Sequence, residues 1–274
     1  MAITVKTNTA VGQALTDLNK TSRALSRSFE KISSGKRIAR ASDDAAGLGV
    51  AENLRAASAS AAVAARNTND GISVIAIAEG ATNEVGNLLV RMRELAVQSA
   101  SETLGTSERA YAQTEFTALK NEITRISEVT EFNGTSLTNG TTTSLDVQVG
   151  INATANDQIS ISFGDLGTTA LGIGAATVAT AAGASTAIGL IDGAIDDING
   201  YRATYGATEN RLTSALNNTE SFIETTQAAE SNIRDADFGA ETSQLAANQI
   251  LQQAGVSILQ QAKQVNQAAL GLLN

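Results

Sequence analysis

The sequence predicts a mainly α-helical fold, with long antiparallel helices, a terminal coiled coil formed by the two chain ends and a small β-hairpin insertion. Three observations predict it. Proline is absent from all 274 residues, so long helices meet no proline kink. Apolar residues make up 42% of the chain but aromatic residues only 3%, so the core must consist of small aliphatic side chains that allow close helix packing. Apolar residues also recur at helical spacing near both ends.

The predicted N-terminal helix carries a heptad stripe whose members advance by alternating steps of four and three residues. They are Val11, Leu15, Leu18, Ser22, Leu25, Phe29 and Ile32. A second stripe of almost the same period lies near the other end: Ala247, Leu251, Ala254, Ile258, Ala262, Val265, Ala269 and Leu272. Neither helix can bury its stripe alone, so we expect the two helices to pair. The expected packing residues are Leu15, Leu18, Leu25, Phe29 and Ile32, opposed by Leu251, Ile258, Val265 and Leu272.

The middle of the chain predicts further helices around a short β excursion. The pattern of residues 45–100 predicts one long helix or two adjoining helices. Residues 107–130 are predicted to form another helix, with Ser107 as its N-cap. A Glu-Phe-Asn-Gly turn at residues 131–134 ends that helix. Alternating patterns at residues 145–151 and 158–163 predict two strands of a hairpin. Residues 167–185, close to low complexity, read as an exposed loop, and helical pattern resumes from 186 to about 231.

Charge is distributed unevenly along the chain. Residues 1–40 contain eight Lys or Arg against two acids, a net of +6, whereas the whole chain carries −9, so the remainder carries −15. Lys20, Arg23, Arg27 and Lys31 form a basic stripe. The chain as a whole is acidic, which favours a solvated or partner-facing helix side over nucleic-acid binding. Residues 242–274 carry only Lys263, and their Gln, Asn and Ser face predicts a crowded interior or the wall of a polar channel, or else a Gln-rich bundle.

Composition also limits the function classes. The chain has no Cys and no His, which excludes thiolate or imidazole metal ligands, a Cys nucleophile and an imidazole base. Asp192, Asp196 and Asp197 could line one helix side, but no accompanying acid, base or phosphate loop is found. We therefore expect no enzyme, cofactor or metal site. Residues 1–13 lack the features of a secretory signal, and no apolar stretch of about 18 residues exists, so membrane insertion is not expected.

Several segments resemble bacterial flagellins. They are residues 18–21 (Leu-Asn-Lys-Thr), 31–38 (Lys-Ile-Ser-Ser-Gly-Lys-Arg-Ile), 42–47 (Ser-Asp-Asp-Ala-Ala-Gly), 66–73 (Arg-Asn-Thr-Asn-Asp-Gly-Ile-Ser), 92–98 (Met-Arg-Glu-Leu-Ala-Val-Gln), 132–134 (Phe-Asn-Gly), 249–255 (Gln-Ile-Leu-Gln-Gln-Ala-Gly) and 264–267 (Gln-Val-Asn-Gln). The resemblance covers residues 1–140 and 186–274 and is that of a short form lacking outer variable domains. It implies a terminal helical inner-tube domain from residues 1–42 plus 235–274. A helical core domain spans 43–234, with a β-hairpin and flexible loop at 135–185.

The resemblance implies a structural subunit that polymerises into the extracellular flagellar filament used for motility, after export by the flagellar type III apparatus. Its implied partners are further copies of itself, sister flagellins, an export chaperone, and cap and junction proteins. Asp43, Asp44 and Gly47 would form a spoke turn between the domains. Arg91, Leu95 and Glu115 match the subunit-stacking segment that innate immune receptors detect. Val90 stands where receptor-detected members usually carry Gln, which argues against receptor recognition.

Two other readings remain open at this stage. A hook-filament junction protein shares the terminal helices, although the turn at residues 132–134 and the segment 249–255 favour flagellin proper. A secreted adhesin could display the Thr-rich middle, but it would be a stable monomer.

Overall fold

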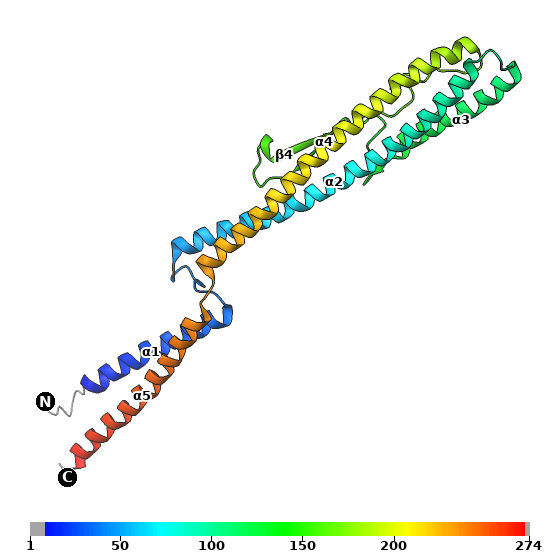
Figure 1. Ribbon diagram of the computed structural model, residues 1–274. Helices are drawn as coiled ribbons and strands as arrows, with labels where there is room; N and C mark the ends of the chain where they lie inside the picture. Colours follow the sequence, from blue (N-terminus) through cyan, green and yellow to red (C-terminus); the bar gives the residue numbers. More distant parts are fainter. Residues whose placement is uncertain (1–8, 272–274) are drawn as a thin grey trace. The chain divides into compact units, whose positions relative to one another are not determined.

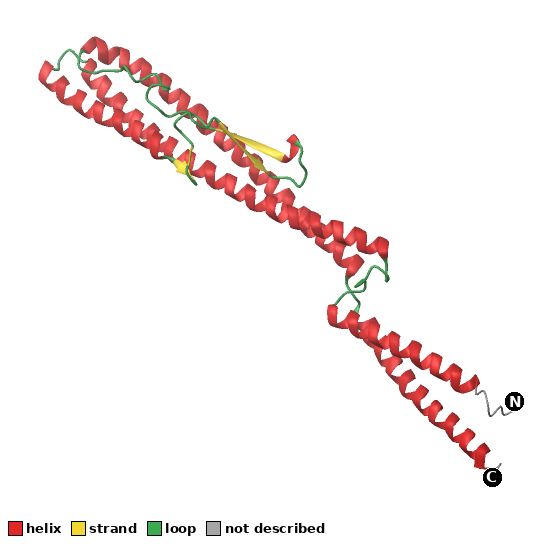
Figure 2. Ribbon diagram, turned by 180° about the vertical axis from the view of Figure 1, so that it is seen from behind, coloured by secondary structure: helices red, strands yellow, loops and turns green. Residues whose placement is uncertain are grey.

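A computed structural model describes residues 9–271, with the backbone alone at residue 10 and residues 265–271. Its long helices are α1 (Thr9–Ser34), α2 (Ala45–Ala100), α3 (Thr106–Val129), α4 (Ala181–Arg234) and α5 (Phe238–Gly271) (Figure 1). Between α3 and α4 lie two antiparallel strand pairs, β1 (Glu131–Phe132) with β2 (Thr135–Ser136) and β3 (Ser144–Gln148) with β4 (Gln158–Ser162), and the short 3-10 helix η1 (Ala155–Asp157) (Figure 2). The predicted mainly α fold with a small hairpin is confirmed.

The chain forms two compact units. The terminal unit comprises Met1–Ala56 and Thr225–Asn274, and the second unit comprises Ala57–Glu224. The domain division expected at residues 42 and 234 falls at the breaks between α1 and α2 and between α4 and α5. The compact terminal unit extends beyond those breaks, into the first turns of α2 and the last turns of α4.

In the terminal unit, α1 and α5 lie side by side along their lengths (Figure 1). Nζ of Lys31 lies 3.8 Å from a carboxylate oxygen of Glu241. Farther along the pair, a Cβ placed on Gly255 would lie 3.3 Å from Leu18 Cδ1. Residue numbers rise along α5 while they fall along α1, so the two helices are antiparallel.

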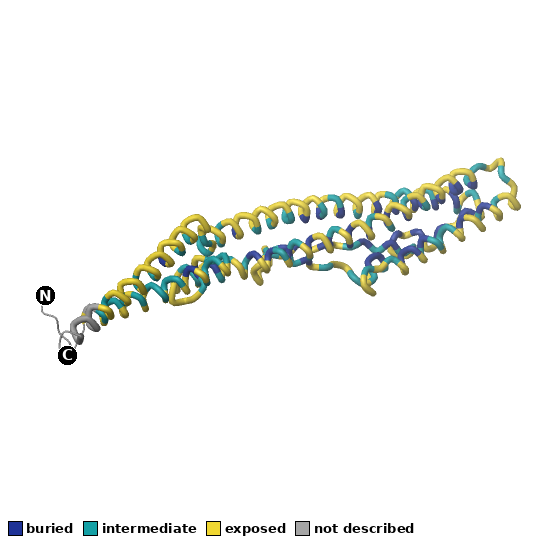
Figure 3. The backbone as a smooth tube through the Cα atoms, turned by 90° about the horizontal axis from the view of Figure 1, so that it is seen from below, coloured by how far each residue is buried: buried dark blue, intermediate teal, exposed yellow. Residues whose placement is uncertain are grey.

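The second unit holds most of the buried residues, which Figure 3 colours dark blue along the backbone. Residues of α2, α3 and α4, such as Leu89, Phe116 and Ile191, form one core cluster. A second cluster brings the hairpin β3–β4 against α2 and α4, through Ile161 and Tyr205 among others. The Tyr205 hydroxyl accepts a 3.2 Å hydrogen bond from the backbone N–H of Gly164, which fixes the chain just after β4 to α4.

The prediction of an exposed loop over residues 167–185 is wrong. Leu171, Ile173 and Val178 are at most 3% exposed and belong to the helical core cluster. The segment has little regular structure, yet its spaced apolar side chains fill the space between the helices. Helix α4 also begins at Ala181, five residues before the predicted start at 186.

Two local details also differ from expectation. Gly105, rather than Ser107, is the N-cap of α3, and no side chain caps that end. The turn predicted at residues 131–134 is present, but it also joins the short strands β1 and β2. Asn133 and Gly134 have φ values of 49° and 78°, the left-handed conformation that makes Asn-Gly the preferred pair for a tight hairpin. Within residues 9–271, no helix combines the length and apolar character needed to cross a membrane.

Candidate assembly surfaces

The α1–α5 pair packs through a stripe that differs partly from the predicted one. On α1, Leu18, Leu25 and Ile32 are partly buried, whereas Leu15 and Phe29 are 47% and 50% exposed. On α5, the buried or partly buried stripe recurs every three or four residues, and Leu251 and Ile258 lie outside it. Its members are Leu245, Asn248, Gln252, Gly255, Leu259 and Ala262. The prediction is therefore wrong for four residues, which do not form the buried seam within one chain: Leu15, Phe29, Leu251 and Ile258.

Two of the predicted packing residues are outside what the structure can describe. Val265 lies in α5, but only its backbone is described. Leu272 lies beyond residues 9–271. Their packing therefore stays a prediction.

Leu251 and Ile258, which lie outside the packed stripe, are part of an exposed apolar surface on α5. Leu251 and Ile258 are 57% and 56% exposed, and Ile250 and Val256 extend the surface around the helix. Leu251, Ala254 and Ile258 also line one wall of a groove of about 460 Å³, and Ala14 and Leu18 of α1 contribute to the opposite wall. Exposed aliphatic side chains along a groove are typical of a surface that another protein covers.

The buried seam itself is unusually polar. Asn248 is 5% exposed and its Nδ2 has no hydrogen-bond partner, while Ser28 of α1 is 3% exposed. The seam also contains Gly255, where the close approach of Leu18 leaves little room for a Cβ. Sequence reasoning missed these residues because it looked for a continuous apolar stripe, whereas the packed stripe of α5 includes Asn248, Gln252 and Gly255.

The predicted spoke turn lies between α1 and α2. Oδ2 of Asp43 accepts hydrogen bonds from the backbone N–H groups of Arg40 at 3.0 Å and Ala39 at 3.2 Å. These bonds, the Arg40 bond foremost, and the nearby charges of Lys31 and Arg40 lower the pKa of Asp43. Asp44 precedes α2, and its Oδ1 accepts a 2.8 Å bond from the N–H of Gly47.

The same turn is bonded to the end of α4, in the same unit. The N–H of Arg37 donates to the carbonyl of Arg234 at 2.7 Å, and its guanidinium donates to the carbonyl of Ile233 at 2.6 Å. Arg234 in turn forms an ion pair with Glu52 of α2 at 3.0 Å. These bonds connect the segment between α1 and α2 to the end of α4, and the end of α4 to the first turns of α2.

The predicted stacking segment divides between surface and core. Arg91 bonds Glu115 of α3 through Nε at 2.9 Å and Glu94 at 2.8 Å, and all three side chains are exposed. The hydrogen bonds that Arg91 donates to Glu94 and Glu115 raise the pKa of Arg91. Leu95 is only 3% exposed and belongs to the helical core. Other side chains therefore cover Leu95, and its part in subunit stacking stays a prediction.

Of the carboxylates considered for catalysis, Asp192 forms an ion pair with Arg93. Asp192 accepts a 2.6 Å hydrogen bond from Nε of Arg93, and this bond lowers the pKa of Asp192, so it is not held as a proton donor near neutral pH. Among the residues that the structure describes, no group of three or more acidic side chains is arranged to hold a metal ion.

Comparison with known families matches both ends of the chain. The family described as "Bacterial flagellin N-terminal helical region" matches residues 5–143, and "Bacterial flagellin C-terminal helical region" matches residues 188–273. Residues 144–187, which contain the hairpin β3–β4 and the packed segment after it, lie between the two matches.

Individual relatives agree with these matches. The chain is 40% identical over 247 residues to a flagellin of Halalkalibacterium halodurans, covering 90% of this chain and 91% of the relative. It is 38% identical over 302 residues to a flagellin of Bacillus subtilis, covering 97% and 98%. Among solved structures, the crystal structure of Bacillus cereus flagellin matches with a TM-score of 0.51 and 34% identity, covering 56% of this chain and 88% of that one.

Proposed function

Because the chain belongs to the bacterial flagellin family, we propose that it is a structural subunit of the bacterial flagellar filament in which α1 and α5 supply the main contacts with neighbouring copies. Its length of 274 residues supports a short form without large outer domains.

The observation that carries the proposal is the exposed apolar surface of α5. Leu251 and Ile258 repeat at seven residues and Ile250 lies beside them, so one side of the helix offers aliphatic side chains along two turns. Burying such area yields about 25 cal/mol per Å², a gain available only when another molecule covers it. Neighbouring copies carrying the same groove and the same stripe can supply that cover, and a contact between different faces of identical subunits propagates into an open filament.

The neutral character of α5 supports an interior position in the filament. Between Phe238 and Gly271 the charged residues are Glu241, which pairs with Lys31, and Lys263. An uncharged Gln-rich and Asn-rich side chain set can be enclosed by other subunits, or line a polar channel, without leaving an unpaired charge. We therefore assign α1 and α5 to the inner tube of the filament.

The remaining assignments follow from family membership and from the turn geometry. Asp43, Asp44 and Gly47 would serve as the spoke, since their bonds stiffen the connection between α1 and α2. The exposed Arg91–Glu115 ion pair would lie at a stacking contact. The subunit would be exported by the flagellar type III apparatus, with a chaperone, cap and junction proteins as partners, and would function outside the cell.

Seeded growth of purified protein tests the proposal. Short filament fragments are mixed with monomer, and elongation is followed by light scattering and electron microscopy. We expect elongation above a threshold monomer concentration. A protein that stays monomeric at every concentration in the presence of seeds would contradict the proposed function.

A further inference from the structure

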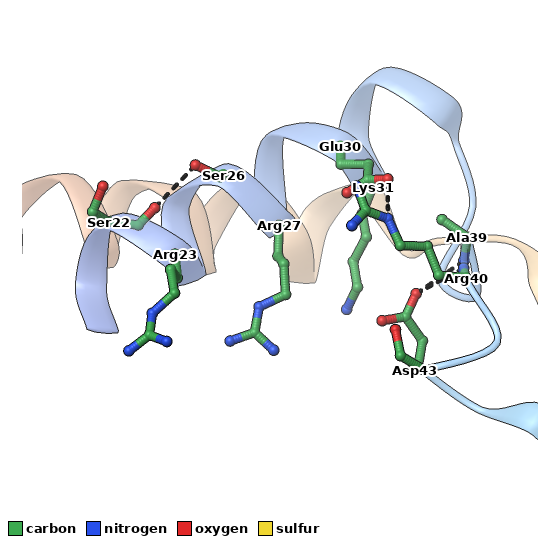
Figure 4. Close-up of a pocket in the computed structure, with 10 residues that line it drawn as sticks. Ser22, Arg23, Ser26, Arg27, Glu30, Lys31, Ala39, Arg40 and Asp43 are labelled. Carbon is green, nitrogen blue, oxygen red and sulfur yellow. Dashed lines mark hydrogen bonds and ion pairs between the residues drawn. The ribbon is translucent and has the colours of Figure 1, made fainter. Parts of the chain in front are cut away.

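A basic cleft lies beside α1 in the terminal unit. It has a volume of about 420 Å³ and is formed by one side of α1 together with the connection to α2. Figure 4 shows Arg23, Arg27 and Lys31 projecting to the same side of α1, with Arg40 and Asp43 at the end of the row. Three residues of the predicted basic stripe, Arg23, Arg27 and Lys31, therefore line this cleft, whereas Lys20 does not.

Most charged groups around the cleft have an ion-pair partner or accept backbone hydrogen bonds, but the guanidinium groups of Arg23 and Arg27 have no ion pair among the described residues. Arg40 pairs with Glu30 at 2.8 Å, Lys31 pairs with Glu241 at 3.8 Å, and the Asp43 carboxylate accepts two backbone N–H groups. Arg23 uses only Nε, in a 3.3 Å bond to the carbonyl of Asn19. Within residues 9–271, Arg27 has no ion pair or side-chain hydrogen bond. The cleft therefore retains positive charge that suits an anionic partner.

The second unit of another copy has the opposite charge. Residues 57–224 contain nineteen Asp or Glu against eight Lys or Arg, a net of −11. Since filament growth brings identical chains together, the most abundant anion at the contact is the acidic surface of a neighbouring copy. Charge complementarity of this kind accelerates encounter and fixes register.

Spacing identifies which acids fit. Arg23 and Arg27 are four residues apart, a rise of about 6 Å on a helix. On α4, Glu220 and Glu224 have the same separation, are both exposed, and have no ion pair among the described residues. The other α4 pair with this spacing begins at Asp192, which is already bonded to Arg93.

We propose that Arg23 and Arg27 bind Glu220 and Glu224 of a second copy of the chain, in an electrostatic contact that sets the rate and register of subunit addition. This inference rests on the proposed filament function and names a partner surface for it. It adds a polar contact to the apolar stripe of α5, and the basic cleft shares no lining residue with the apolar groove.

The test uses full-length chains and wild-type seeds. Wild-type elongation comes first, because its absence would reject filament formation itself, independently of this contact. With that established, Arg23→Glu/Arg27→Glu should elongate at least roughly tenfold more slowly at low salt, with unchanged far-ultraviolet circular dichroism. Glu220→Arg/Glu224→Arg, which alters the other unit, should be slowed to a similar degree. Normal elongation by either double variant would overturn the proposal.

A charge exchange makes the test specific. Wild-type elongation should slow as sodium chloride screens the contact. The quadruple variant that carries both charge reversals should recover most of the wild-type elongation rate on seeds of its own sequence. Arg66→Glu/Arg202→Glu is the matched control, because it reverses two exposed arginines of α2 and α4 and changes net charge equally. The control should elongate normally. An equal slowing of the control, or no recovery in the quadruple variant, would reject the pairing.

Discussion

The backbone N–H of Gly47 donates a 2.8 Å hydrogen bond to Oδ1 of Asp44, the residue that immediately precedes α2. This bond satisfies one of the N–H groups that the start of every helix leaves without a partner. A Cβ on residue 47 would clash with Oδ2 of Asp44 and would lie 2.9 Å from Cδ1 of Ile38. Glycine therefore lets the capping carboxylate and the buried Ile38 approach the same turn of the helix.

The first prediction concerns this cap. Asp44→Ala removes the acceptor, and we expect a loss of about 1 kcal/mol in the free energy of unfolding, the usual cost of losing a helix N-cap. Urea unfolding followed by circular dichroism measures it. Asp44→Ser is the control, because serine caps helices about as well as aspartate. Equal destabilisation by both changes would show that the cap bond is not the cause.

The second prediction is a pH dependence at Asp43. Its bonds from Arg40 and Ala39 lower its pKa below the ordinary value of 3.8, so the carboxylate binds protons less readily in the folded state. The stabilisation it provides is thus complete above the unfolded pKa and is lost as pH falls through the lower, folded pKa. The Tm difference between wild type and Asp43→Ala should be constant from neutral pH to about pH 5 and shrink below pH 3.8. A difference that persisted unchanged in strong acid would contradict the assignment.

The helix pairing could be predicted from the sequence, but the face of α5 that packs could not. Two stripes of period 3.5 run along α5, one containing Leu251 and Ile258 and the other containing Asn248, Gly255 and Leu259. Choosing the more apolar stripe is reasonable for an isolated hairpin, where burial drives pairing. In a chain that assembles, the apolar stripe can serve a neighbour instead, so hydrophobicity alone cannot assign the two faces.

The packed segment after β4 illustrates a second limit. Gly, Ala and Thr dominate residues 167–185, and such composition is typical of exposed loops. Leu171, Ile173 and Val178 are nevertheless buried, because three long helices leave a space that spaced aliphatic side chains can fill. That space depends on contacts distant in sequence. By contrast, the strands β3 and β4 were predictable, since alternation of apolar and polar residues is a local signal.

The third prediction separates the two stripes of α5. Ile258→Asp places a charge on the exposed stripe, so the monomer should keep its α1–α5 pairing while filament growth is blocked. Leu259→Glu places a charge on the partly buried stripe and should disrupt the pairing itself as well as growth. Hydrogen exchange of α1 and seeded elongation distinguish the two effects. Normal filaments from Ile258→Asp would show that this stripe is not a subunit contact.

The fourth prediction concerns the predicted stacking segment. Leu95 is 3% exposed, so Leu95→Ala should leave a cavity in the helical core and cost about 2–5 kcal/mol of stability. Arg91→Ala, which removes an exposed ion pair with Glu115, should leave the monomer Tm nearly unchanged. Any effect of Arg91→Ala should therefore appear in filament growth. Denaturant unfolding of the monomer compares the two variants, and a stable Leu95→Ala monomer would contradict the core position.

The last prediction concerns Asn248, whose buried Nδ2 has no partner in the α1–α5 seam. A buried polar group without a hydrogen bond costs about 1–3 kcal/mol, so Asn248→Leu should raise the free energy of unfolding by an amount of that order. A single polar residue in a helical seam also fixes the register of the pair. The more stable variant should consequently tolerate shifted pairings and elongate more slowly on wild-type seeds.

Gln252→Leu, one turn along the same stripe but only partly buried, is the matched control and should gain less stability. Destabilisation by Asn248→Leu would mean that the amide forms a hydrogen bond worth retaining, and the seam would then depend on its polar layer for stability as well as for register.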